Sequence, residues 1–143
     1  MTLDTAFSAY NALAVVGWAI LILAPSWRFG RNVISGRALP ALFSLSYAII
    51  FLPALIGSEG GFVSIEALRT LLTADPRIVL GAWLHYLAFD MFIGAWMAGE
   101  AEQRGIPHAW MVPVLLATFL AGPVGWLAFF ALRRRYPTKI AQP

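Results

Sequence analysis

The sequence predicts an all-α, polytopic membrane protein built as a bundle of four transmembrane helices. Of its 143 residues, 60% are hydrophobic and only 12% are charged, whereas a soluble domain has roughly 25% charged residues. The charges are also segregated, because residues 5–27, 38–58 and 105–132 contain no Asp, Glu, Lys or Arg, and residues 78–99 contain only Asp90. Each stretch reaches the roughly 20 residues that a helix needs to cross about 30 Å of hydrocarbon.

The four spans are expected at about residues 7–24, 39–56, 78–98 and 110–132. A short basic loop, residues 28–37, joins the first two spans. The first span is expected to be a retained helix and not a signal peptide, because the leader before it contains no Lys or Arg. No internal repeat or low-complexity segment divides the chain, so residues 1–143 are expected to form a single transmembrane domain.

A short amphipathic helix is predicted between spans two and three. Four apolar side chains recur there on one helical face: Ile65, Leu68, Leu71 and Leu72. This helix is expected to lie in the membrane interface and to end at Asp75-Pro76, where the third span starts.

The composition excludes some functions and leaves the orientation almost undecided. The chain has no cysteine, which rules out disulfide bonds and thiolate chemistry.

The net charge of +3 lies in loops and tail, where it suits anionic lipid headgroups and not nucleic acid. With four spans, one side would carry six Lys and Arg and the other four, so a cytoplasmic tail is only slightly favoured.

Asp90 is the main candidate for a functional residue, because a carboxylate at the centre of a membrane helix costs roughly 2.5–3.5 kcal/mol. Tyr86 precedes it by four residues and shares its helical face. His85 is turned away from it by about 140° around the helix axis, which argues against a simple His–Asp dyad. A structural role for Asp90 stays open, as a carboxyl that is hydrogen-bonded to one of four polar side chains: Asn11, Ser46, Tyr47 or Tyr86.

His85 and the aromatic residues indicate a second face of the third span. His85 aligns with Phe89, Phe92 and Trp96, and these aromatic rings would line a slot for a flat conjugated ligand or simply face lipid. The spacings H-x-x-x-H and E-x-x-H are absent, so no metal site is predicted. A mononuclear metal, or a haem held by His85 and His108, remains a less favoured alternative.

The sequence Gly122-Pro123-Val-Gly125 interrupts the expected fourth span. Proline removes a helical hydrogen bond and kinks the helix, while glycine lets another backbone approach closely. Two interpretations stay open: a kinked packing seam between helices, or a cleft beside the kink for a ligand that enters from the lipid.

These segments carry a family resemblance. The stretch His85–Trp96, with Gly122–Gly125 and the Pro25-Ser-Trp-Arg28 exit from the first span, resembles the bacterial branch of the abscisic-acid-deficient-type (neoxanthin synthase-like) family of integral membrane proteins. The resemblance covers nearly the whole chain. Plant members are associated with the conversion of violaxanthin to neoxanthin, an isomerisation that opens an epoxide and generates an allene. The resemblance therefore implies a carotenoid-like ligand and a location in the bacterial inner (cytoplasmic) membrane.

Epoxide opening of this kind needs an acid at the epoxide oxygen and a base at the polyene. The resemblance implies Asp90 for one part and His85 or Tyr86 for the other. Ligand binding is expected from six residues: Phe89, Phe92, Trp96, Gly122, Pro123 and Gly125. The sequence requires no cofactor, and a carotenoid or similar conjugated lipid is the expected bound molecule.

Two alternatives to an isomerase are retained. The first is a non-catalytic, pigment-binding or structural subunit of a homo-oligomer or of a larger membrane complex of the photosynthetic type. The second is a proton-coupled transporter that uses Asp90, which is less favoured because one short chain would have to oligomerise to form a pathway. Membrane lipids are expected partners in every case.

Overall fold

The computed structural model describes residues 2–137, and all regular structure within them is helical. In chain order the elements are α1 (Leu3–Leu23), η1 (Gly30–Ala38), α2 (Leu39–Leu55), α3 (Ile65–Ala74), α4 (Pro76–Arg104), α5 (His108–Leu120) and α6 (Gly122–Arg133). The prediction of an all-α fold is therefore confirmed.

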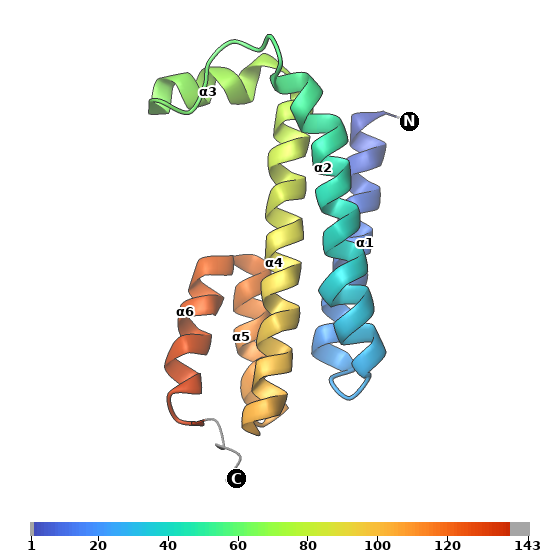
Figure 1. Cartoon of the computed structure of the whole chain (residues 1–143), viewed down its shortest axis with the longest axis vertical. Helices are drawn as coiled ribbons and strands as arrows, with labels where there is room; N and C mark the ends of the chain where they lie inside the picture. The colour runs from blue at the N-terminus through green and yellow to red at the C-terminus, as the bar shows by residue number, and fades with distance from the viewer. Residues whose placement is uncertain (1, 138–143) are drawn as a thin grey trace, which may run out of the picture.

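Three helices are long and apolar enough to cross a membrane. They are α1, the continuous helix Gly30–Leu55 formed by η1 and α2, and the 29-residue α4. Figure 1 shows them side by side, with the chain running in alternating directions. Helix α4 lies at the centre of the bundle and contacts every other helix, so its side chains decide what the core contains.

The prediction of a single transmembrane helix at residues 110–132 is wrong. The segment forms two short helices, α5 of 13 residues and α6 of 12, each about 20 Å long or less at about 1.5 Å per residue. They pack against each other as a hairpin that turns back near the middle of α4. The expected four spans are thus not confirmed, and the described part of the chain has three long apolar helices and a re-entrant hairpin.

The break lies at Ala121, whose φ of −154° and ψ of 72° are not helical. Proline at position 123 cannot donate the backbone hydrogen bond that a continuous helix would require, and its ring would clash with the carbonyl of Phe119 one turn earlier. As a result, Pro123 stands in the first turn of a new helix, where its missing N–H costs nothing. The kink expected from the sequence is a complete break.

The basic segment 28–37 is also not an irregular loop. After a tight turn at Ala24–Trp27, most of it is a wide π-helix, η1, that runs directly into α2. Ser35 fastens this segment to the bundle, because its hydroxyl donates a hydrogen bond of 3.0 Å to the carbonyl of Gly17. One arginine of the segment, Arg31, is 5% exposed, and its charge therefore lies inside the protein.

The amphipathic helix between the second and third long helices is confirmed as α3. Ser64 caps its amino end by accepting a hydrogen bond of 3.0 Å from the N–H of Ala67. It ends at Asp75, as the sequence predicts, and the Asp75 carboxylate in turn caps α4 through the N–H of Arg77 at 2.8 Å. Figure 1 shows α3 beside the end of the bundle where α4 begins, projecting sideways at a steep angle to α4, which is the orientation expected of an interfacial helix.

The hairpin changes the distribution of charge between the two ends of the bundle. Because α6 returns to the end where α4 stops, the first described residues and the last lie at opposite ends. Seven arginines lie at what we call the arginine-rich end, where α1, α4 and α6 finish: Arg28, Arg31, Arg37, Arg104, Arg133, Arg134 and Arg135. Only Arg69 and Arg77 lie at the opposite end, and Lys139 falls outside the described residues.

This asymmetry predicts that the arginine-rich end faces the cytoplasm. The chain has no cysteine, so single cysteines can be introduced at exposed positions without a background signal. In intact bacterial cells, a membrane-impermeant maleimide is expected to label Val63→Cys, whereas Gln103→Cys should react only after the cells are permeabilised. Labelling in the reverse order would contradict the prediction.

Candidate site at the break between α5 and α6

Asp90 lies on the face of α4 that the α5–α6 junction covers, and it is 8% exposed. Its Oδ1 atom packs directly against Gly122, where an added Cβ would overlap the carboxyl. Its Oδ2 atom is buried and has no hydrogen-bond partner among residues 2–137. Buried polar atoms are nearly always hydrogen-bonded, so this oxygen is an exception that requires an explanation.

Tyr86 lies one turn before Asp90 on the same face, as the sequence spacing predicts. Its hydroxyl borders the Asp90 carboxyl and donates a hydrogen bond of 3.2 Å to the carbonyl of Phe119. Phe119 belongs to the last turn of α5, where backbone carbonyls have no partner within the helix. The break in the helix therefore supplies the acceptor that holds Tyr86 beside Asp90.

The amino end of α6 also faces this carboxyl. The helix begins at Gly122, and Ala121, which precedes it, provides no side-chain cap. The amino end of a helix carries partial positive charge from its unpaired N–H groups, which favours a nearby carboxyl. Asp90 thus combines three features: burial in the bundle, a position at a helix amino end, and an oxygen without a hydrogen-bond partner among residues 2–137.

The contact with Gly122 makes a specific prediction about stability. Gly122→Ala is expected to cost about 1–3 kcal/mol, because the new Cβ forces the Asp90 carboxyl out of its position. The cost should be smaller in an Asp90→Ala background, where no carboxyl is present to be displaced. Unfolding in a chemical denaturant measures both values, and equal costs in the two backgrounds would contradict the contact.

His85 is not part of this site. It is exposed on another face of α4, where its ring centroid lies 5.7 Å from that of Tyr47 and 4.7 Å from that of Phe89. The structure thus agrees with the helical geometry, which argued against a His85–Asp90 dyad. His108 lies at the start of α5, with Nε2 at 2.8 Å from the carbonyl of Ile22, so the two histidines do not meet as haem ligands would.

The predicted aromatic residues continue the face of His85 and not that of Asp90. Phe89, Phe92 and Trp96 are 55%, 53% and 41% exposed. Several hollows border this aromatic stripe, among them one of about 240 Å³ beside Phe92 and Trp96, one of about 310 Å³ beside Phe89 and Phe92, and one of about 260 Å³ beside His85. The six expected ligand-binding residues therefore divide into two groups, one on the outer surface of α4 and one, Gly122–Gly125, at the hairpin.

A family model described as ABA4-like (ABA DEFICIENT 4-like) matches residues 5–129. The chain belongs to the ABA4-like family. The match covers α4, α5 and the first part of α6, and it confirms the resemblance at the level of the family. No curated protein and no solved structure gives a significant match.

The sequence did not single out several side chains that shape the site of this ABA4-like protein. Trp18 is 3% exposed, lies 5.4 Å from the Phe119 ring between centroids, and packs where Gly94 leaves room on α4. Thr118 is fully buried, and its hydroxyl donates a hydrogen bond of 2.8 Å to the carbonyl of Val114. No motif in the sequence marks these residues, and the signal that could have found them is the glycine that faces each of them, Gly94 for Trp18 and Gly125 for Thr118.

Of the four partners considered for Asp90, Asn11 is already engaged. Its Oδ1 accepts a hydrogen bond of 2.8 Å from the indole N–H of Trp83. Ser46 and Tyr47 belong to α2, on the side of the bundle where Tyr47 packs against His85. Tyr86 is therefore the side chain among the four that the ABA4-like fold places next to the Asp90 carboxyl.

Proposed function

We propose that this chain is a membrane enzyme that isomerises a carotenoid-like substrate, opening the epoxide of a xanthophyll-type molecule. Membership in the ABA4-like family supports a relationship to neoxanthin synthesis. The single observation that favours catalysis is the buried Oδ2 of Asp90, which has no protein partner among the described residues and lies at a helix break. Ionisable groups inside membrane bundles are most often retained for function.

The proposed step needs no oxidant, reductant or second substrate. Asp90 in its acid form donates a proton to the epoxide oxygen while the C–O bond breaks, and the oxygen becomes a hydroxyl. The remaining carboxylate then removes a proton from the neighbouring polyene carbon, whose electrons form the new double bond of the allene. The carboxyl regains its proton, and the product is an isomer of the substrate.

The second group in this proposal is Tyr86 and not His85. The Tyr86 hydroxyl borders the carboxyl, and it would hold the substrate oxygen by turning its one O–H from the Phe119 carbonyl to that oxygen. His85 lies on a different face of α4 and packs against Tyr47 and Phe89. We therefore assign Asp90 the proton transfers and Tyr86 the positioning of the oxygen.

The aromatic stripe favours a second candidate function, the binding of a pigment without conversion. Phe89, Phe92 and Trp96 project from the outer surface of α4, where rings can stack along a flat polyene from the lipid. A binding subunit would hold a fixed number of pigment molecules per chain, and it would not need a carboxylic acid that donates a proton.

One experiment separates the two candidates. The protein is purified in mild detergent, its absorption spectrum is recorded, and a large molar excess of an epoxy-xanthophyll is then added and the products are resolved by chromatography. The enzyme is expected to convert many molecules per chain. A vibronic polyene spectrum without conversion would favour the binding subunit. A Soret band would contradict both candidate functions and indicate that the protein binds haem.

A further inference from the structure

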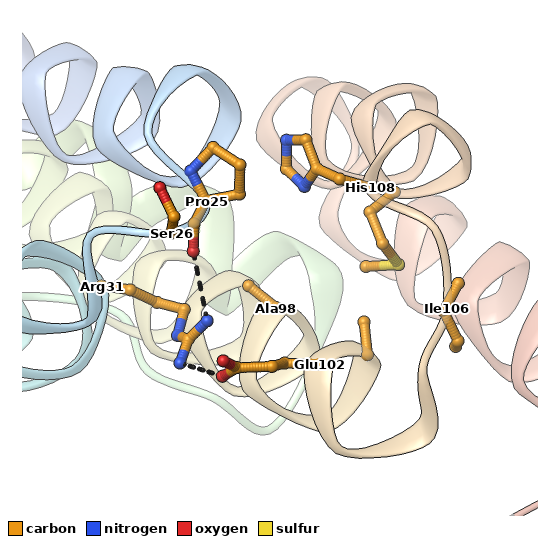
Figure 2. A pocket seen from close by; sticks show the side chains of 9 residues that line it. Pro25, Ser26, Arg31, Ala98, Glu102, Ile106 and His108 are labelled. Atoms are coloured by element: carbon orange, nitrogen blue, oxygen red, sulfur yellow. Dashed lines mark hydrogen bonds and ion pairs between the residues drawn. The ribbon is translucent and has the colours of Figure 1, made fainter.

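A further hollow lies at the arginine-rich end of the bundle, where α4 ends beyond Asp90. It measures about 280 Å³ and lies between the turn after α1, the last turns of α4 and the start of α5. Figure 2 shows polar groups from Pro25, Ser26, Arg31, Glu102 and His108 around it. The rest of its wall is apolar and consists of Ala98, Ala101, Ile106 and Met111.

Arg31 forms the buried, charged part of this wall. Its side chain is 6% exposed, and its guanidinium donates hydrogen bonds to Glu102 at 2.5 Å, to the carbonyl of Pro25 at 3.4 Å and to Asn32 at 3.0 Å. A guanidinium has five N–H groups, so these three bonds leave two for another acceptor. The bond to Pro25 is long and easily exchanged.

The charges around the hollow do not cancel. Glu102 is shared by two arginines, because Arg28 donates to its Oε1 at 2.9 Å while Arg31 bonds its Oε2. Two cations therefore face one anion. The amino end of α5 adds partial positive charge, since Pro107 provides no side-chain cap there. An anion is the ligand that this surplus would attract.

We propose that this hollow binds the phosphate-containing headgroup of an anionic phospholipid. Arginine pairs with phosphate oxygens through several hydrogen bonds at once, and the apolar wall fits the glycerol and the first methylene groups. The volume of about 280 Å³ lies just below the range of small-molecule sites, roughly 300–1,000 Å³, so it suits a headgroup and not a long polyene. The site lies where the helix ends meet the headgroup layer.

Glu102 makes the proposal testable in two directions. Its carboxylate occupies donors of Arg28 and Arg31 that a phosphate would use, so Glu102→Gln is expected to strengthen binding. Arg31→Gln removes the buried cation and is expected to weaken binding roughly tenfold or more. Arg69 and Glu66 form an exposed ion pair of 2.8 Å at the opposite end of the bundle, so Arg69→Gln and Glu66→Gln are matched controls.

The experiment uses the full chain purified in mild detergent, with dioleoylphosphatidylglycerol as the probe and dioleoylphosphatidylcholine as the zwitterionic reference. Native mass spectrometry measures the lipid retained by each variant. We expect the parent protein to retain phosphatidylglycerol at least tenfold more strongly than phosphatidylcholine, Glu102→Gln to retain more of it, and both controls to match the parent.

Three outcomes would overturn the proposal: equal retention of the two lipids, the same loss in Arg69→Gln as in Arg31→Gln, or weaker binding by Glu102→Gln. If Arg31→Gln does not fold, the lipid retained by Glu102→Gln still tests the proposal, because unfolding cannot increase the affinity for the lipid. Inorganic phosphate is tested as a competitor. If it displaces the lipid and stabilises the protein against heat as strongly as the lipid does, the ligand is soluble phosphate and the lipid proposal fails.

Discussion

Asp90→Asn is expected to lower the conversion of an epoxy-xanthophyll by roughly 10²- to 10⁴-fold, the usual contribution of a positioned acid or base. The amide has nearly the size of the carboxyl and fits the same space against Gly122. However, it has no acidic proton to give and cannot take one from the polyene carbon. The product is measured by chromatography after a fixed time, with equal amounts of purified protein.

Two controls separate chemistry from folding in the Asp90→Asn experiment. Glu59→Gln makes the same carboxyl-to-amide change at an exposed position and is expected to keep full activity. The unfolding temperature and elution volume of Asp90→Asn should match those of the parent protein. Conversion by Asp90→Asn at the parental rate would remove Asp90 from the mechanism and leave it a structural residue.

Gly125→Val is expected to destabilise the protein by about 3 kcal/mol, the upper part of the usual range for overpacking. A side chain at this position would overlap both the hydroxyl and the backbone of Thr118. A side chain can rotate away from such an overlap, but the backbone of α5 cannot. The hairpin is therefore expected to open, and α6 would no longer bring Gly122 to Asp90.

Unfolding in denaturant measures the loss for Gly125→Val, and Gly99→Ala provides the matched control. Gly99 also lies in a helix, α4, but an added Cβ there meets no atom within 4 Å. Because alanine is the better helix former, Gly99→Ala should be neutral or slightly stabilising. Equal stability of the Gly125→Val and parent proteins would show that α6 does not pack closely on α5.

The hairpin also explains how a membrane bundle can place a polar group at the depth of Asp90. A continuous fourth helix would satisfy its own N–H and C=O groups and offer none to its neighbours. The break frees the carbonyl of Phe119, which Tyr86 uses, and turns the amino end of α6 toward the carboxyl. The Gly122-Pro123 pair thus carries a structural role and a role in the candidate site at the same time.

Much of the site could be predicted from residue spacing. A helix advances about 100° per residue, so Tyr86 had to share the face of Asp90 and His85 had to lie elsewhere. The same rule placed Phe89, Phe92 and Trp96 in line with His85. These statements depend only on positions within one helix, and the structure agrees with each of them.

Contacts between helices could not be predicted in this way. The sequence indicated a kink at Pro123, but a kinked span and a hairpin contain the same residues and the same apolar length. The choice depends on Gly125 meeting Thr118 and on Gly122 meeting Asp90, which are contacts between separate segments. The burial of Arg31 against Glu102, 71 positions apart, was hidden for the same reason.

The sequence by itself determined that this protein is helical, that it has helices long and apolar enough to cross a membrane, and that Asp90 and Tyr86 face one direction, because hydropathy and helical period are local properties. Only the tertiary structure decided the number of long spans and the partner of the Asp90 face. It also made one end of the bundle strongly basic. These features depend on whether α6 continues in the direction of α5 or folds back beside it. The close packing of Gly122 on Asp90 and of Gly125 on Thr118 favours the folded-back arrangement.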